Sequence, residues 1–287
     1  MNLGVDADRL EKFRTKTYRI NSYERLRSQK DAIQFVDERG FVFFWPIKGA
    51  LLPSIWIATA GDRPVPNKHH DPGHVCWGWK DTALDKKVWY YGRILRQRNT
   101  MISMAIMPYF YALSPNFGDP ENDYLLEYKR GEMSLETKQV YETLLRYGSL
   151  DSLSLRREAR LIAPDNNSRF DKAMRVLQAQ FRILPTGIAE TGSWHYAFIY
   201  SLTHTSHPDL PEQARSIPES RARSLILMKY IQSVGAASYQ QVHFLLGWTK
   251  EQIHTTVQDL KIENCLVDII PDSNLKETVI ALPSLLA

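Results

Sequence analysis

Apolar residues in the middle of the chain recur at the spacing of an amphipathic helix in three consecutive stretches. The first stretch begins near Ser134 and ends at Gly148. Its apolar face consists of Val140, Tyr141, Leu144 and Leu145. Asp151 is placed to cap a short second helix. A third helix has an apolar face of Phe170, Ala173, Met174 and Leu177.

Strand-like runs follow these helices at residues 181–184 and 194–200, on either side of the turn Glu190-Thr191-Gly192-Ser193. Three helices followed by a hairpin are the element order of a winged helix-turn-helix. We therefore predict one such unit over residues 124–202.

The last part of the chain repeats this plan. Gly148, Asp151, Leu155 and Ala159 are matched by Gly235, Ser238, Val242 and Leu246 at a constant offset of 87 residues. Phe170, Met174 and Leu177 are matched by Ile253, Val257 and Leu260 at an offset of 83 residues. Ser238 with Gln241 and Thr249 with Gln252 have the spacing of a capping box. The repeat predicts a second winged helix over residues 219–287, with strands at 265–270 and 275–282 around a turn at 271–274.

Residues 1–117 have a less regular pattern. Ser22 is placed to cap a helix that ends at Gly40, before an apolar strand at 41–45. A helix is predicted over residues 82–98 and a strand over 101–107. This segment is compatible with a third, N-terminal winged-helix unit that contains an inserted aromatic and histidine-rich loop.

The predicted fold class is therefore α+β and mainly helical, with tandem winged helix-turn-helix units. Two turn-rich or proline-rich stretches, residues 116–123 and 203–218, are predicted to be linkers.

The composition is that of an ordinary globular protein. The chain of 287 residues is 44% hydrophobic, which suffices for the cores of about two domains. Apolar runs are far shorter than the roughly 18 residues of a membrane span, and Asp6, Asp8 and Glu11 make the start of the chain unlike a secretory signal. We therefore expect a cytoplasmic protein without a membrane partner.

Positive charge is concentrated in two stretches, although the net charge is only +4. The first stretch covers the second and third helices of the central unit, where a helix-turn-helix meets phosphates and the major groove. Its candidate DNA contacts are Arg156, Arg157, Arg160, Arg169, Lys172 and Arg175. The second stretch, in the predicted helix 82–98, adds Lys86, Lys87, Arg93 and Arg96. The alternative interpretation is that both stretches are solvated basic surfaces. The equivalent helix of the last segment has mixed charge, and we expect it to contact protein.

Reactive side chains are densest at residues 69–80. His70 and Asp71 are candidates for an acid–base pair, and His69, Trp77, Trp79 and Lys80 are candidates for a pocket that stacks a base. The alternative is that the tryptophans belong to a core and the histidines bond to the backbone. His70, His74 and Cys76 do not match a closed zinc site, so no metal is expected. Phosphate-loop, nucleophile-elbow and dinucleotide motifs are absent, so no cofactor or nucleotide is expected.

Several motifs resemble the AlkZ/YcaQ-type bacterial DNA glycosylases. They are Leu52-Pro53-Ser54-Ile55-Trp56, His69-His70-Asp71-Pro72, Trp77-Gly78-Trp79-Lys80 and Met107-Pro108-Tyr109-Phe110-Tyr111, ahead of tandem winged helices. The resemblance implies three winged-helix units that form a concave basic surface for duplex DNA. It also implies removal of alkylated or crosslinked bases by hydrolysis, without a metal.

The glutamine motif of those enzymes is missing here. The corresponding stretch reads Gly40-Phe41-Val42-Phe43-Phe44-Trp45, without a glutamine or a carboxylate. Gln178-Ala179-Gln180 spells the motif but lies at the end of a helix, where polar residues are expected anyway. We therefore expect a duplex-DNA-binding relative whose catalytic residues are unknown. The alternatives are an active glycosylase that uses residues 69–80 and a non-enzymatic protein-interaction module.

Overall fold

The computed structural model describes residues 6–67, 70–116, 118–192, 195–269 and 279–286. The chain is mainly helical, with small antiparallel sheets, and divides into two compact units. Unit 1 consists of Met1–Lys80, Thr100–Ile106 and Glu219–Ala287, and unit 2 of Asp81–Asn99 and Met107–Pro218. None of the helices in the described ranges is long and apolar enough to cross a membrane. The boundaries of the three predicted segments stay predictions.

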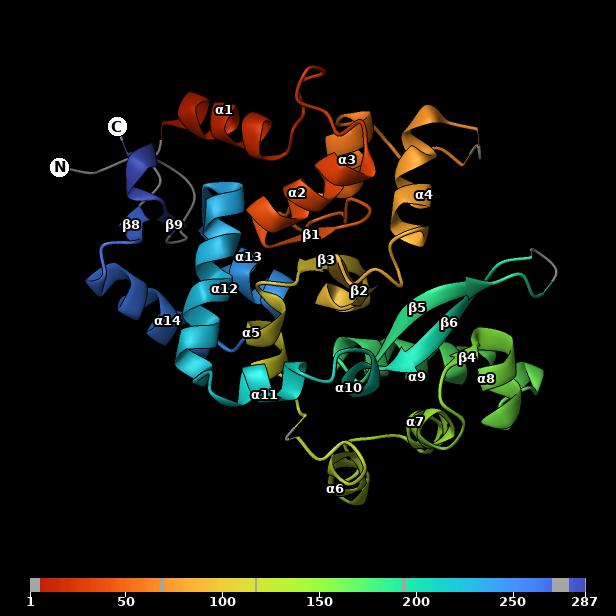
Figure 1. Cartoon of the computed structure of the whole chain (residues 1–287). Helices are drawn as coiled ribbons and strands as arrows, with labels where there is room; N and C mark the ends of the chain where they lie inside the picture. Colours follow the sequence, from red (N-terminus) through yellow and green to blue (C-terminus); the bar gives the residue numbers. More distant parts are fainter. Residues whose placement is uncertain (1–5, 68–69, 117, 193–194, 270–278, 287) are drawn as a thin grey trace. The chain divides into compact units, whose positions relative to one another are not determined.

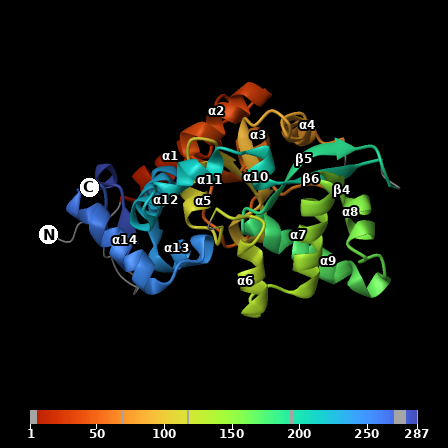
Figure 2. The same cartoon turned by 60° about the horizontal axis from the view of Figure 1, so that its bottom comes forward.

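Three helices form the centre of unit 2, as predicted. They are α7 (Leu135–Tyr147), α8 (Ser152–Glu158) and α9 (Asn167–Ala179), with the short elements β4 (Leu150–Asp151) and η3 (Pro164–Asn166) between them. Ser134 caps α7 and Asp151 caps α8, each by accepting hydrogen bonds from backbone amides of the first turn. Gly148 ends α7 at a φ of 74°, which glycine adopts without strain. Figure 2 shows α7 and α9 side by side.

A hairpin completes this group of elements. β5 (Ile183–Ala189) pairs antiparallel with β6 (Ala197–Leu202), which also pairs with β4, so the sheet order is β4-β6-β5 (Figure 1). The predicted hairpin is confirmed, although Ser193 and Trp194 of its predicted turn and second strand lie outside the described residues. The core below the sheet is fully buried at Val140, Leu144, Leu155, Leu177 and Ile183.

The predicted helix over residues 82–98 is wrong. This stretch contains turns, the strand β2 (Trp89–Arg93) and the single turn η2 (Leu95–Gln97). The run Val88-Trp89-Tyr90-Tyr91 is β-branched and aromatic, which favours a strand, and its rings are buried in unit 2.

The predicted linker at residues 203–218 is also wrong, because this stretch forms helices that pack within unit 2. It forms α10 (Thr203–Ser206) and α11 (Leu210–Arg215), and α11 packs against α5 (Met107–Ala112). Leu210 is buried, and burial lowers the pKa of His207 to about 4. The other predicted linker is mostly loop and leads into α6 (Asp123–Lys129).

The C-terminal part of unit 1 contains the same element order as the centre of unit 2. Its elements are α12 (Glu219–Val234), β7 (Ala236–Ser238), α13 (Tyr239–Leu246), α14 (Lys250–Ile262), β8 (Val267–Ile269) and β9 (Val279–Ala281). The sheet order is β7-β9-β8. Both predicted capping boxes, at Ser238 and Thr249, are confirmed. The predicted turn at 271–274 lies outside the described residues.

The N-terminal part of unit 1 is held to this C-terminal part. The Arg14 guanidinium of α1 (Ala7–Thr17) donates to the carbonyls of Val234 and Ala236, each at 2.9 Å. The remaining elements of unit 1 are α2 (Gln29–Arg39), β1 (Phe41–Phe43), α3 (Ile55–Ala60), η1 (Pro72–His74), α4 (Val75–Asp81), β3 (Asn99–Ser103) and η4 (Pro283–Leu285).

The predicted cap of α2 at Ser22 is wrong. Ser28 caps this helix instead, because Asp31 lies three residues later and bonds back to the Ser28 amide as a capping box requires. The helix ends at Gly40 as predicted, and β1 then pairs with β3.

Candidate nucleic-acid interface

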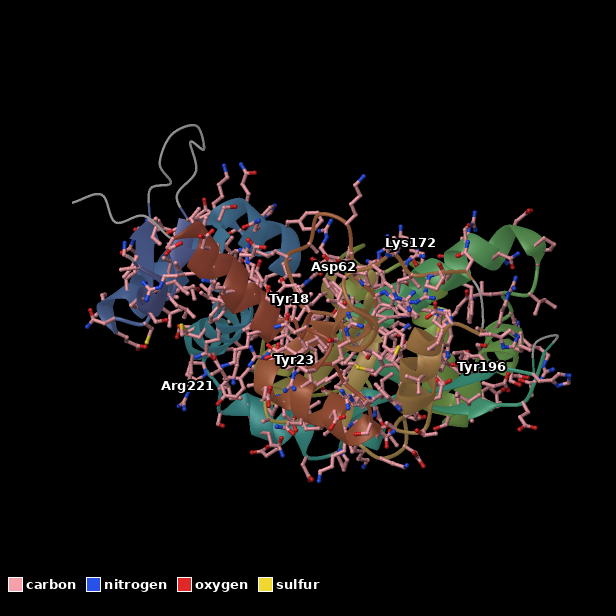
Figure 3. The ribbon with its side chains drawn as sticks, turned by 90° about the horizontal axis from the view of Figure 1, so that it is seen from above. Tyr18, Tyr23, Asp62, Lys172, Tyr196 and Arg221 are labelled. Carbon is pink, nitrogen blue, oxygen red and sulfur yellow. The ribbon has the colours of Figure 1, made fainter. Side chains whose placement is uncertain are left out.

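Four predicted DNA contacts lie exposed on α8, on the turn that follows it and on α9. Their set, which we call the α8–α9 cations, consists of Arg157, Arg160, Arg169 and Lys172. The side chains of Arg157 and Arg169 are 67% and 64% exposed, and Lys172 is labelled in Figure 3. Arg157 pairs with Glu158 at 3.4 Å and Arg169 with Glu136 at 3.3 Å. Exposed pairs of this kind contribute only about 0–1 kcal/mol, so a phosphate can replace the carboxylate.

Asp171 joins the two predicted basic stretches. Its carboxylate binds Arg93 of β2 at 2.6 Å and also Arg175, one turn further along α9. The Asp171 side chain is 46% exposed, so the pair of arginines lies at the surface. The two guanidinium groups converge on one point, which the Asp171 carboxylate occupies. Without that carboxylate, the same arrangement would suit a phosphate. Sequence reasoning placed Arg93 and Arg175 correctly in basic stretches but did not anticipate this shared anion.

Two other arginines of the stretch have structural roles. The Arg156 guanidinium donates to the carbonyls of Leu161 at 2.7 Å and Ala163 at 3.2 Å, which fixes the turn after α8. Arg182 is only 2% exposed and pairs with Glu127. Arg182 therefore does not add to the surface charge that its position in the sequence suggests.

The remaining cations of the second stretch lie on turns. Lys86, Lys87 and Arg96 are exposed, and Lys87 and Arg96 have φ values of 52° and 54°. Their side chains therefore do not share the helical face that the sequence predicted.

An aromatic cluster in unit 1 surrounds the predicted residues 70–80. The ring of Trp45 lies 5.4 Å from that of Trp56, 5.9 Å from that of Trp77 and 6.0 Å from that of His74, measured between centroids. Trp56 is fully buried, whereas Trp77 is 43% exposed. The sequence identified Trp77, but Trp45 and Trp56 were not predicted to lie beside it. Trp45 lies at the end of a predicted strand and Trp56 lies in a short helix, and neither position in the sequence indicates that the rings meet.

Asp71 is held by an arginine that the sequence analysis missed. Both Asp71 oxygens accept from the Arg63 guanidinium, at 3.0 and 2.5 Å, and one also accepts from the Gly73 amide at 2.8 Å. The hydrogen bonds from Arg63 hold the pKa of Asp71 below its usual value. The guanidinium also lies 4.8 Å from the centre of the Trp56 ring. Asp71 is thus a fixed carboxylate at the edge of the aromatic cluster, and His70 beside it is exposed.

The other predicted pocket residues have different surroundings. Trp79 is half-buried, and its backbone carbonyl accepts a hydrogen bond from the side-chain Nε2 of Gln29 at 2.7 Å. Lys80 is only 2% exposed, with its ammonium 5.4 Å from the centre of the Trp77 ring. His69 lies outside the described residues.

Both glutamine side chains of the Gln178-Ala179-Gln180 run form hydrogen bonds to other residues of unit 2. Gln178 is buried and bonds to the Arg93 amide and the Met174 carbonyl, at 3.1 and 2.9 Å. Gln180 bonds to Glu127 and Arg182. These contacts are consistent with a structural role. Among the described residues, no cluster of three or more His, Cys, Asp or Glu side chains is arranged to hold a metal ion.

Comparison with known proteins adds a family and a fold. The sequence model of the family described as AlkZ related matches residues 26–247. A solved structure of the Streptomyces sahachiroi DNA glycosylase AlkZ is similar to this chain with a TM-score of 0.57 and 10% sequence identity, over 98% of this chain and 71% of that one. At this identity the likeness concerns the fold alone. No curated protein matches the sequence significantly.

Proposed function

The chain belongs to the AlkZ-related family, and from that premise we propose that it binds duplex DNA through unit 2. In this proposal the elements α7, β4, α8, α9, β5 and β6 form a winged helix, with α9 as the helix that meets the major groove. The matching elements in the C-terminal part of unit 1 form a second winged helix, and a third covers the N-terminal segment. The cytoplasmic location predicted from the sequence remains part of the proposal.

The observation that carries the proposal is the exposure of the α8–α9 cations. The DNA backbone is recognised chiefly by arginine and lysine side chains that replace condensed counterions. Arg157 lies on α8 and Arg169 and Lys172 lie on α9, the two helices that approach DNA in a helix-turn-helix, while Arg160 lies on the turn after α8. The half-buried Arg93–Asp171–Arg175 cluster adds two guanidinium groups in the same unit, which the Asp171 carboxylate partly neutralises. Because the α8–α9 cations are exposed, the structure favours DNA binding over an interpretation in which this face docks protein.

A salt titration of binding to a random-sequence duplex tests the proposal. If all four α8–α9 cations contact phosphates, the logarithm of the binding constant should fall against the logarithm of salt concentration with a slope of about −3.6. Fluorescence anisotropy of a labelled duplex measures this slope. Binding that is insensitive to salt, or absent at low salt, contradicts the proposal.

Asp171 gives a second, sharper test. In the Asp171→Asn variant, the arginine pair loses the one negative charge that partly neutralises it, so about one further positive charge becomes available to phosphates. We expect duplex affinity to rise about eightfold at about 0.1 M salt, with the salt slope steeper by about 0.9, the value for one added phosphate contact. Asp165→Asn is the matched control, since it removes an exposed acid from the adjoining turn η3. Equal effects of the two variants would show that only net charge matters.

A base-excision activity is the second proposed function, and the aromatic cluster beside Asp71 favours it. In glycosidic hydrolysis, water bonds to the sugar C1′ while the bond from C1′ to the base nitrogen breaks and its electrons leave with the base. A carboxylate kept ionised by Arg63 suits stabilisation of the positive charge on the sugar, and His70 is then the candidate acceptor of the water proton. Incubation with an N7-alkylated duplex should release free base. Binding without release would remove this second function and leave the first intact.

A further inference from the structure

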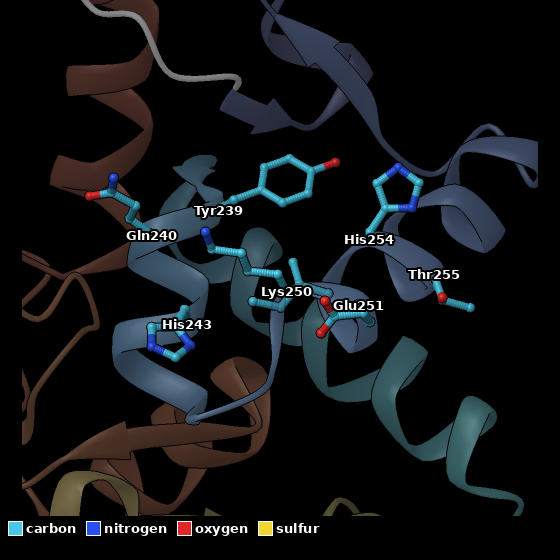
Figure 4. Close-up of a pocket in the computed structure, with 8 residues that line it drawn as sticks. Tyr239, Gln240, His243, Lys250, Glu251, His254 and Thr255 are labelled. Carbon is cyan, nitrogen blue, oxygen red and sulfur yellow. The ribbon is translucent and has the colours of Figure 1, made fainter.

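A groove of about 600 Å³ lies between α13 and α14, in the C-terminal part of unit 1 (Figure 4). None of the candidate DNA contacts or residues of the aromatic cluster lines it. Its volume falls within the roughly 300–1,000 Å³ typical of small-molecule sites. The groove is therefore large enough to hold a small-molecule ligand, separately from the proposed DNA contacts.

Two helices contribute aromatic rings to the walls of the groove. The half-buried Tyr239 contributes a ring from α13, and Ile253 beside it is only 1% exposed. His254 contributes a second ring from α14, and Figure 4 shows the Tyr239 side chain extending from α13 toward it. Aromatic rings from two helices suit a flat ring system, which gains stacking and apolar contact.

The rim of the groove carries balanced charge. Lys250 and Glu251 are neighbours, and Glu251 lies in the first turn of α14, where its carboxylate already compensates the helix dipole. The His243 Nδ1 lies 2.6 Å from the Trp248 carbonyl and donates to it, so Nε2 is the ring nitrogen that can bond to a ligand. The rim thus offers donors and acceptors without a net charge.

Nucleic acid strands and anions fit this groove poorly. A single strand is bound along a cationic track with aromatic platforms. The α13 sequence contains no lysine or arginine, and Lys250 is offset by Glu251. The groove therefore favours a ligand without phosphate.

We propose that the groove between α13 and α14 binds a small, uncharged, planar heteroaromatic molecule, the chemical class of nucleobases and nucleosides. Tyr239 and His254 contact the faces or edges of the ring, and the His243 Nε2 and Lys250 Nζ bond to its polar edge. This site is independent of the proposed DNA contacts in unit 2.

Adenosine and adenosine 5′-monophosphate, compared by calorimetry and ligand-observed NMR on the full chain, test the proposal. We expect adenosine to bind at least as tightly as the nucleotide, because the rim has no excess positive charge. The Tyr239→Ala variant should weaken adenosine binding about tenfold, the effect expected for loss of one stacking partner, whereas Tyr239→Phe should retain it. Tyr23→Ala is the matched control, because Tyr23 is 76% exposed in the same unit and does not line the groove.

His254→Ala keeps the test decisive if Tyr239→Ala does not fold, since His254 is exposed and its loss leaves the core intact. Absence of adenosine binding overturns the proposal. So does binding that survives both the Tyr239→Ala and the His254→Ala substitutions. Clearly tighter binding of the nucleotide would overturn the assignment to an uncharged ligand. Failure of duplex binding by the same protein would affect only the function proposed for unit 2.

Discussion

The Arg169→Glu/Lys172→Glu double variant is expected to bind duplex DNA at least about fiftyfold more weakly than the unmodified protein at about 0.1 M salt. Loss of two phosphate contacts accounts for this factor, and the reversed charges add repulsion. The salt slope should become less steep by about 1.8. Both side chains are exposed and Arg169 makes only a surface ion pair, so the melting temperature should change little. Anisotropy titrations at several salt concentrations measure both quantities.

The control for this variant reverses two exposed charges in unit 1. Lys12 lies on α1 and is exposed. Arg221, which is labelled in Figure 3, lies on α12 and is also exposed. Lys12→Glu/Arg221→Glu changes the net charge by the same amount but leaves the α8–α9 cations intact. If it weakens binding as much as Arg169→Glu/Lys172→Glu, attraction by overall charge explains the binding and α9 is not the contact helix.

Local signals predicted the helices of the central segment well. Ser134, Asp151 and Gly148 act on the backbone within a few residues, and the apolar face of α9 follows directly from helical spacing. The capping-box spacings placed the caps of α13 and α14 correctly for the same reason. Such signals are readable because caps and amphipathic faces depend on neighbours in sequence.

Apart from the cap of α2, where a local signal at Ser28 was overlooked, the errors arose where distant contacts decide the structure. β2 is a strand because Trp89, Tyr90 and Tyr91 are buried within unit 2, whereas a helix was predicted there. The pairing of Arg93 with Asp171 joins residues 78 positions apart. The contact of Trp45 with Trp77 likewise depends on how β1 and α4 fold together. No pattern in one sequence specifies these contacts.

Arg182 shows most clearly why the number of charged residues in a stretch of sequence does not give the charge on the surface of the protein. Its side chain is buried, pairs with Glu127 of α6 and lies 5.4 Å from the centre of the Tyr141 ring. A buried ion pair depends on both partners, since removal of one leaves an unpaired charge out of water. Arg182 follows the predicted DNA contacts closely in the sequence, whereas its burial assigns it to the stability of unit 2.

Arg182→Met should therefore destabilise the protein by about 3–5 kcal/mol, because Glu127 is then buried without its counter-charge. Chemical denaturation followed by tyrosine and tryptophan fluorescence measures the change. Arg182→Met/Glu127→Leu should recover much of the loss, since two apolar side chains can replace a buried pair. At a temperature where Arg182→Met remains folded, its DNA salt slope should equal that of the unmodified protein. A reduced slope would show that Arg182 contacts phosphate, and the division between the surface cations and the buried arginine would then be wrong.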